Sequence, residues 1–549
     1  MPKPTPPTRR DLLLGGLAAT ALSPGALAAA TGPAGGKKGA KAGAKSAAKV
    51  DPALERAYEV RVAAAVQARD LGLAVQHGNG DEERFPGRIA CFTKALPHDR
   101  FGRVDPKSYG VLLQAIASGD PADFESVPLG GFAKLANPQA AWSVGLVGPD
   151  PAQLACPAAP AFDGAEQAAE MVELYWKALL RDVPFAEYES HPLARAAADE
   201  LSGLPEFRGP RAGGAVTPAT LFRGTTAGDL SGPYLSQFLL KPIPMVPTIV
   251  EQRNRTAVPG LDYLTDWDGW LANQNGALSG VNRFLPKPLF ARNGRDLGEY
   301  VHRDFSYQPY MAACLQALKW GTLPDGGNPY KHSRTQSAFG TFGQPYLLAL
   351  LATVTQASLA VCWYQKWRVH RRLRPEELAG RVELVRRGAA DAPEESRLLS
   401  GLLGSAALAE TQKKFGTALL PQAYPEACPI HPAYPSGHAM IAGACATALK
   451  ACLDESHVVP EPVTASPDGL SLVPYKGAPL SIGGELDKLA ANISLGRNFA
   501  GIHWRSDAAE GLLLGEEVAI RVLSEMKLTG NEIFESWSLR RFDGRRVAV

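Results

Sequence analysis

The amino-acid sequence predicts an all-α protein, in which bundles of helices are joined by long loops that carry function. From Asp51 onward, apolar residues recur every three or four positions with charged residues between them, which is the period of an amphipathic helix. No stretch shows the sustained alternation of polar and apolar residues that is typical of a half-buried strand. With 549 residues and 45% hydrophobic side chains, the chain is long enough to bury a large core.

The expected helices follow one another along the chain. Residues 51–73 and 162–183 have clear helical periods, and the second segment opens with an Asp-Gly cap signal. Long Gly- and Pro-rich loops are expected at residues 201–263 and 458–481. Further helical patterns occupy residues 346–366, 375–387, 395–413, 437–454, 485–495 and 503–524.

The N-terminus resembles a twin-arginine export signal. Paired arginines, Arg9 and Arg10, precede a short and mildly apolar segment, and an Ala-Leu-Ala cleavage site follows. That segment is too short to span a bilayer, so we expect no stable membrane anchor. We predict a signal peptide over residues 1–28, an Ala/Gly/Lys-rich linker over residues 29–50, and a periplasmic or secreted helical domain over residues 51–549.

Charge and cysteine content argue against several classes of protein. The formal net charge is +2, and without residues 1–28 the chain is formally neutral, so no nucleic-acid partner is expected. The seven cysteines include no Cys-x-x-Cys pair, which argues against a structural zinc site or a thioredoxin-like motif. We interpret them as core thiols, although export would also permit one or two disulfides.

The segment HPAYPSGH indicates a binding site for an oxyanion. Pro435 suits the first turn of a helix and Ser436 is a good N-cap, so we expect a helix to begin here. The free N–H groups and partial positive charge of its N-terminus, with the Ser436 hydroxyl and a histidine, would hold a tetrahedral or trigonal-bipyramidal oxyanion. A Pro-Ser-Gly turn that only opens a structural helix is the alternative.

Three segments of the C-terminal half together supply what such an anion needs. Lys366, Arg374 and Arg497 contribute positive charges, and each arginine can grip two oxygens. His438 and His503 remain for chemistry, one as an acid/base and the other bonded to the central atom. A basic run such as KWRVHRRLR is, by itself, usually a solvated helix face. The joint occurrence of the three segments favours a site.

These motifs resemble the set shared by the type 2 phosphatidic acid phosphatases and the vanadium-dependent haloperoxidases: Lys with Arg-Pro, then Pro-Ser-Gly-His, then Arg and His six apart. The separation of Lys366 and Arg374 by eight positions is similar to that of algal and bacterial bromoperoxidases, whereas most phosphatases and fungal chloroperoxidases have one position fewer. Segments such as NGDEERFPGRIACFTKALPHDRFGRV extend the resemblance over most of the chain from Asp51. One departure is Gly496, where many phosphatases have serine; it removes a hydroxyl but no charge.

The resemblance implies the helical-bundle fold of the vanadium haloperoxidases, with vanadate (V5+) as cofactor and an active site mainly in residues 300–525. His503 would bind the metal covalently, His438 would be the acid/base that assists peroxide binding, and Lys366 would polarise the peroxide that the halide attacks. These three would be the catalytic residues. The residues that would hold vanadate are Lys366, Arg374, Ser436, Gly437, Arg497 and His503.

Four further residues are candidates for supporting roles. Trp363 and His431 resemble halide-pocket positions of the bromoperoxidases. Asp304 occupies roughly the place of a family aspartate that buttresses an active-site arginine, or is only structural. Asp507, four residues after His503, would orient that imidazole, or else cap a helix or pair on the surface.

The implied activity is the oxidation of bromide and iodide by hydrogen peroxide to hypohalite, which halogenates small organic acceptors. A phosphatase is the alternative, because the same pocket stabilises a phosphoryl transition state and His503 could serve as nucleophile. Trp363 and His431 favour the peroxidase, since a phosphatase does not need a halide pocket. A non-catalytic phosphate- or vanadate-binding protein would have no reason to keep both histidines. Because relatives form dimers and larger rings, we expect a homodimer or larger homo-oligomer.

Overall fold

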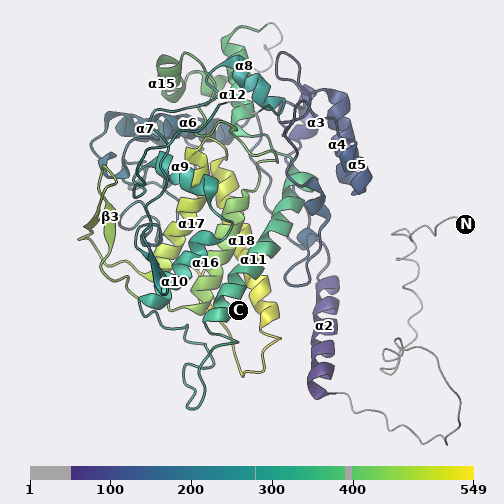
Figure 1. Ribbon diagram of the computed structural model, residues 1–549. Helices are drawn as coiled ribbons and strands as arrows, with labels where there is room; N and C mark the ends of the chain where they lie inside the picture. The colour runs from purple at the N-terminus through teal and green to yellow at the C-terminus, as the bar shows by residue number, and fades with distance from the viewer. Residues whose placement is uncertain (1–50, 278–279, 390–398) are drawn as a thin grey trace, which may run out of the picture. The chain divides into compact units, whose positions relative to one another are not determined.

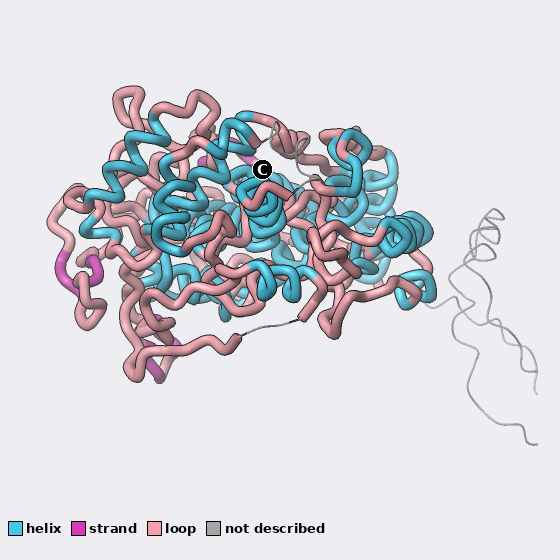
Figure 2. Tube along the Cα trace, turned by 90° about the horizontal axis from the view of Figure 1, so that it is seen from above, coloured by secondary structure: helices cyan, strands magenta, loops and turns pink. Residues whose placement is uncertain are grey.

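The computed structural model describes residues 51–277, 280–389 and 399–549. Within them, Arg56–Val549 form one compact unit, which is mostly helical (Figure 1). The signal peptide and linker predicted for residues 1–50 lie outside the described residues. Helices joined by long loops dominate the unit when it is seen from above as well (Figure 2), so the predicted all-α class is confirmed.

The helices and short 3-10 turns follow the chain in two halves. The first half contains α2 (Pro52–Asp70), α3 (Asp81–Arg84), η2 (Pro86–Arg88), α4 (Pro106–Ser118), α5 (Pro121–Glu125), η3 (Pro138–Trp142), η4 (Pro151–Gln153), α6 (Ala165–Leu179), η5 (Phe185–Glu187), α7 (Pro192–Ser202), η6 (Gln237–Leu239) and α8 (Trp267–Gln274). The second half contains α9 (Gly294–Arg303), α10 (Gln308–Lys319), α11 (Gln344–Tyr364), the π-helix η7 (Gln365–His370), α12 (Pro375–Arg386), α14 (Ser400–Leu403), α15 (Ala406–Phe415), α16 (Gly437–Cys452), α17 (Ile482–Phe499) and α18 (Arg505–Met526).

Helix α16 is the central helix of the C-terminal bundle, and α11, α17 and α18 pack against it (Figure 1). All of its residues from Ala439 to Cys452 are buried. Small residues allow the backbones to approach closely: a Cβ on Gly443 would lie 2.1 Å from the carbonyl oxygen of Leu512. A Cβ on Gly515 would lie equally close, 2.1 Å, to the carbonyl oxygen of Met440. The small residues of the run IAGACATALK therefore allow α16 and α18 to pack closely where they cross.

The predicted helix over residues 395–413 is interrupted in its described part. Helix α14 ends at Leu403, and a new helix, α15, begins after Ser405. The Ser405 Oγ accepts a hydrogen bond from the N–H of Leu408 at 3.2 Å, which satisfies a free donor at the start of α15. The remaining predicted helices agree with the structure apart from their ends, and α3, α4, α5, α7, α8, α9 and α10 are additional.

Three antiparallel hairpins are the only sheets in the described residues. They are β1 (Ile243–Met245) with β2 (Thr248–Val250), β3 (Val463–Ala465) with β4 (Leu472–Pro474), and β5 (Ser538–Arg540) with β6 (Arg546–Ala548). In register, the paired residues are Ile243 with Val250, Val463 with Pro474, and Ser538 with Ala548. The first hairpin lies inside the segment 201–263 and the second inside the segment 458–481, so both predicted loops are partly ordered by backbone pairing.

Helix α11 and the following π-helix form the one helix in the described chain, Gln344–His370, that is long and apolar enough to cross a membrane. Half of its apolar window is buried inside the protein, and α11 packs on α16 and α18. It is therefore a core helix of the bundle, and it carries Lys366 into the protein interior.

The seven cysteines are all buried and free, in agreement with the interpretation as core thiols. Cys445 is typical: its Sγ contacts the carbonyl oxygen of Leu351 at 3.8 Å and the Thr355 hydroxyl at 3.3 Å. Burial raises the pKa of Cys445 to about 12, so the group remains a thiol.

Candidate active site

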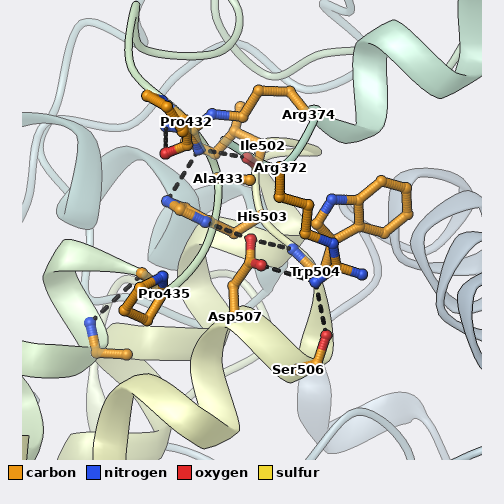
Figure 3. Close-up of polar contacts among 12 residues, drawn as sticks. Arg372, Arg374, Pro432, Ala433, Pro435, Ile502, His503, Trp504, Ser506 and Asp507 are labelled. Carbon is orange, nitrogen blue, oxygen red and sulfur yellow. Dashed lines mark hydrogen bonds and ion pairs between the residues drawn. The ribbon is translucent and has the colours of Figure 1, made fainter. Parts of the chain in front are cut away.

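The three motif segments, far apart in the chain, meet around His503. Lys366 lies in η7, Arg374 immediately precedes α12, and Ser436 immediately precedes α16. Arg497 lies in the last turn of α17, and His503 lies in the short turn that leads into α18. Figure 3 shows the imidazole of His503 between Arg374 and Asp507.

Helix α16 begins where the sequence predicts. Ser436 is its N-cap, and its Oγ accepts from the N–H of Ala439 at 3.4 Å. The N–H of Ser436 donates to the carbonyl oxygen of Asp507 at 2.9 Å, which fixes the start of α16 to the first turn of α18. Gly437 is the first helical residue, and a Cβ on it would lie 3.6 Å from the ring of Trp363. The positive end of the α16 dipole thus lies beside both the first turn of α18 and Trp363.

Lys366 is fully buried and has carbonyl groups as partners. Its Nζ donates to the carbonyl oxygens of Pro432 at 2.7 Å and Ala433 at 2.8 Å. None of these hydrogen-bond partners in the described chain is a carboxylate. Burial, with a contribution from the charge of Arg374, lowers the pKa of Lys366 to about 7. An anion bound nearby would supply the missing counter-charge and favour the ammonium form.

Arg374 links the first motif to the other two. Its Nε donates to the carbonyl oxygen of His431 at 3.0 Å, and its Nη1 to that of Ile502 at 2.8 Å. Nη1 also lies 3.0 Å from Nε2 of His503. The backbone N–H of Arg374 donates to Glu377 Oε2 at 2.6 Å, which holds the residue at the start of α12. The guanidinium is therefore pre-positioned next to the imidazole before any ligand binds.

Arg497 adds a third cation from the end of α17. Its Nη1 donates to the carbonyl oxygen of Val301 at 2.7 Å. Its Nε is buried and has no hydrogen-bond partner among the described residues. A buried donor without a partner costs free energy, so an oxyanion that accepted from it would be stabilised.

His503 is held in one tautomer. Its Nδ1 lies 2.7 Å from Oδ2 of Asp507, which as a carboxylate can only accept, so Nδ1 carries the proton. Burial, together with the charges of Arg374 and Lys366, lowers the pKa of His503 well below its usual value. The imidazole is therefore neutral, and its unprotonated Nε2 carries a lone pair that accepts a hydrogen bond from Nη1 of Arg374 at 3.0 Å in this structure. Asp507 thus has the orienting contact expected for it.

His438 pairs with Asp304, and this contact differs from the expected one. The Nε2 of His438 lies 3.0 Å from Oδ1 of Asp304, whose side chain is 2% exposed. Asp304 was expected to buttress an arginine, but its second oxygen, Oδ2, has no hydrogen-bond partner in the described chain. Asp304 ends α9, and packing of that helix on α17 brings it to α16. The imidazole of His438 is 27% exposed, so it lies at the open side of the site.

The two candidate halide-pocket residues lie side by side. The rings of Trp363 and His431 have centroids 5.0 Å apart and are tilted by 42°. Trp363 Nε1 donates to the carbonyl oxygen of Ala136 at 3.1 Å, and His431 Nδ1 lies 3.0 Å from Nη2 of Arg374. Burial, with the charges of Lys366 and Arg374, lowers the pKa of His431 well below its usual value, so this imidazole stays neutral.

One buried charge of the site, Arg372, is absent from the sequence-based prediction. Its Nη1 donates to Oδ1 of Asp507 at 2.9 Å, and its Nη2 to Oε2 of Glu170 at 2.9 Å. A basic run such as KWRVHRRLR is usually a solvated helix face, so its pattern does not single out Arg372. In the structure this side chain is only 3% exposed. The signal that was present is its position two residues before Arg374.

The combined donor set suits an oxyanion. Three buried basic side chains, a helix N-terminus and one unprotonated imidazole nitrogen converge. In the part of the chain that the structure describes, no group of three or more His, Cys, Asp or Glu side chains is placed to ligate a metal ion directly. A central atom that brings its own oxygens and takes a single nitrogen ligand would match this arrangement.

Comparison with known proteins agrees with this geometry. Residues 346–531 match the family described as the VCPO second helical-bundle domain. The vanadium-dependent bromoperoxidase of Ascophyllum nodosum is 36% identical over 518 residues, spanning 90% of this chain and 92% of that protein. That of Corallina pilulifera is 33% identical and spans 90% of this chain and 98% of that protein. The homohexameric structure of the second vanadate-dependent bromoperoxidase (AnII) from Ascophyllum nodosum has a TM-score of 0.85 and 30% identity, covering 93% of this chain and 94% of that one. The chain therefore belongs to the vanadium-dependent bromoperoxidase family.

Proposed function

We propose that this protein is a vanadate-dependent haloperoxidase, which oxidises bromide and iodide with hydrogen peroxide to hypohalite and thereby halogenates small organic acceptors. The observation that carries the proposal is the state of His503. Its Nδ1 proton is held by Asp507, and its unprotonated Nε2 accepts from Nη1 of Arg374 at 3.0 Å. If the oxygens of an anion took over the guanidinium, this nitrogen would be released to bind the electrophilic centre that carries them.

The residues present fit vanadate. Arg497 has a buried Nε without a partner in the described chain, and Lys366 has no carboxylate partner there. Both groups would be satisfied by the oxygens of the anion. When bound, vanadate supplies a Lewis acid that activates peroxide toward a halide. His503 would be its nitrogen ligand, and the residues that would hold its oxygens are Lys366, Arg374, Ser436, Gly437 and Arg497.

Proton transfer is assigned to His438. If Nε2 donates to Asp304, at 3.0 Å, then Nδ1 of His438 is the free acceptor for a proton of incoming peroxide. The 27% exposure of this imidazole allows it to meet a substrate that arrives from solvent. Lys366 acts as the charge that polarises the peroxide from the buried side.

The halide preference is assigned to Trp363 and His431. Bromide and iodide are easier to oxidise than chloride, so they require less electrophilic activation of the peroxide. The neutral His431 lies against Arg374 and offers a hydrogen bond rather than a further positive charge. A pocket of this kind favours the larger, more polarisable halides.

The proposed function is tested with purified protein and two parallel assays. After loading with orthovanadate, the protein should brominate a phenol-type acceptor in the presence of peroxide and bromide. A phosphate-ester assay without vanadate tests the phosphatase alternative, in which His503 is the nucleophile. Phosphate-ester hydrolysis together with absent bromination would replace the peroxidase by that alternative.

We further propose that the protein is exported through a twin-arginine signal to the periplasm or the medium, and that it assembles as a homo-oligomer. Arg9-Arg10, the mildly apolar segment and the Ala-Leu-Ala site support the first proposal. The homohexameric neighbour from Ascophyllum nodosum supports the second. Cell fractionation tests the location, and light scattering on the purified protein tests whether its mass exceeds that of the 58.3 kDa chain.

A further inference from the structure

We infer that Arg372 is a positioning residue of this site: through Asp507, it keeps Nε2 of His503 unprotonated and correctly aimed for the oxyanion. This inference deepens the proposed function and rests on it. Arg372 has no assigned place in the vanadate set, and it does not contact His503 itself. Its role is indirect: Arg372 holds the carboxylate of Asp507, and that carboxylate holds the imidazole of His503.

Arg372 is a buried junction between two acidic side chains. Its Nη1 donates to Oδ1 of Asp507 at 2.9 Å and to Oγ of Ser506 at 2.7 Å. Its Nη2 donates to Oε2 of Glu170 at 2.9 Å and to Oε1 of Gln167 at 2.6 Å. Figure 3 shows Arg372 approaching the Asp507 and Ser506 side of this junction. The planar fork of a guanidinium can serve two pairs of acceptors at once, which a lysine cannot do.

The carboxylate of Asp507 is fixed by contacts on both oxygens. Oδ1 accepts from Arg372, while Oδ2 accepts from Nδ1 of His503 at 2.7 Å and from the N–H of Trp504 at 3.1 Å. The ring of Trp504 in turn lies 5.0 Å from the Arg372 guanidinium. Rotation of the carboxylate would break at least one of these contacts. The orientation of the imidazole, and the nitrogen that carries its proton, are therefore set together with the position of Arg372.

The charge of Arg372 is also needed. The side chains of Glu170 and Asp507 are 4% and 0% exposed, so neither can be solvated by water. Without a cation between them, the two buried carboxylates would face each other uncompensated, which is strongly unfavourable. Asp507 would then move or change its hydrogen bonds, and its fixed contact with His503 would be lost.

Through Glu170 and Asp507, Arg372 links helices α6 and α18. A second buried arginine, Arg505, joins the same two helices and serves as the control that separates this role from simple packing. Arg505, in the first turn of α18, bonds Glu173 of α6 through Nε to Oε2 at 2.9 Å and through Nη2 to Oε1 at 2.5 Å. Arg505 is 5% exposed, comparable to Arg372, but none of its hydrogen bonds involves Asp507 or His503. Breaking it should remove an ion pair between α6 and α18 without touching the imidazole.

The test compares Arg372→Lys with Arg505→Lys in the full-length protein. The proton position on His503 is measured in vanadate-free protein by 1H–15N correlation spectra of labelled histidines, with His503→Ala identifying the signal. Binding of orthovanadate is measured by titration. We expect Arg372→Lys to shift the His503 signal away from the Nδ1–H form and to raise the Kd for vanadate about 10- to 100-fold, the range for outer residues of metal sites. Arg505→Lys should change neither.

Two results would overturn the inference: a folded Arg372→Lys protein with wild-type His503 signal and Kd, or an equal rise of Kd in Arg505→Lys. Arg372→Gln should have the larger effect, because it removes the charge as well as the fork. If it does not fold, Arg372→Lys still decides the question. Failure of the wild-type protein to bind vanadate would instead contradict the proposed function, whereas the His503 spectra would still report on Arg372.

Discussion

His503 and Asp507 form a hydrogen bond within a single turn of chain: Nδ1 of the imidazole lies 2.7 Å from Oδ2 of the carboxylate, four residues later. Because the carboxylate can only accept, the proton is on Nδ1 and the lone pair is on Nε2. The same carboxylate oxygen accepts from the N–H of Trp504 at 3.1 Å, so the bond is part of the start of α18. The local geometry of one helix N-terminus thus determines which nitrogen can bind a ligand.

Replacing His503 by alanine should abolish stable vanadate loading, because it removes the side chain that we propose as the nitrogen ligand of the metal. Lys366→Ala should retain part of the loading but lose most of the turnover, since it removes a charge and leaves the nitrogen ligand in place. Vanadium content after gel filtration, measured beside bromination activity, checks both. His332→Ala, which changes an exposed histidine, serves as the control. Equal vanadium content and full turnover in His503→Ala would rule out the assignment.

His431→Phe and His431→Ala should change the bromide KM or the pH profile, because the imidazole lies against Arg374 and beside Trp363. The wild-type protein should oxidise bromide and iodide with little chloride activity. Steady-state assays with all three halides across pH measure this. Strong wild-type chloride oxidation, or a His431 variant that is kinetically identical to wild type, would remove the proposed role.

Gly443→Ala should destabilise the bundle by about 1–3 kcal/mol, the usual cost of overpacking a core. The new Cβ would lie 2.1 Å from the carbonyl oxygen of Leu512, a backbone atom, so the crossing of α16 and α18 must open. Urea unfolding gives the free energy. Gly404→Ala is a control, because nothing lies within 4 Å of a Cβ there. Similar unfolding free energies for the two variants would contradict the close crossing.

Acid should weaken the fold through His98, whose pKa is lowered by burial from 6.5 to about 4. Between these values the unfolded chain binds a proton that the native protein does not, so the free energy of unfolding falls as the pH is lowered from 6.5 to 4. Urea unfolding across this range should show a shallower dependence for His98→Gln than for wild type. An unchanged slope in His98→Gln would mean that other groups cause the loss.

Changing both Arg9 and Arg10 to lysine should keep the charge of the N-terminus but retain the protein in the cytoplasm, because the twin-arginine route reads the arginine pair itself. Fractionation of an expressing host, with a Lys3→Arg variant as control, measures the exported share. Unchanged periplasmic or extracellular yield of the double variant would contradict the proposed route.

Short-range features of this protein could be predicted from its sequence. Ser436 caps α16 because a serine oxygen next to the first helical turn satisfies free N–H groups, whatever the rest of the chain does. The apolar period predicted the buried helices, since it reflects which face of a helix leaves water. The charges of Lys366, Arg374 and Arg497 indicated an anion site because no other ligand needs so many cations near a helix N-terminus.

Long-range pairings could not be predicted in this way, because they depend on how the helices pack. His438 and Asp304 are separated by 134 positions, and their contact exists because α9 packs on α17 beside α16. Arg372 and Glu170 are separated by 202 positions. In the sequence Arg372 is one of several basic residues, and only its burial between two carboxylates distinguishes it from the solvated ones. The sequence by itself determined which residues are available for the chemistry, while the tertiary structure decided which of their charges are buried and paired, because pKa depends on burial and on neighbours from other helices.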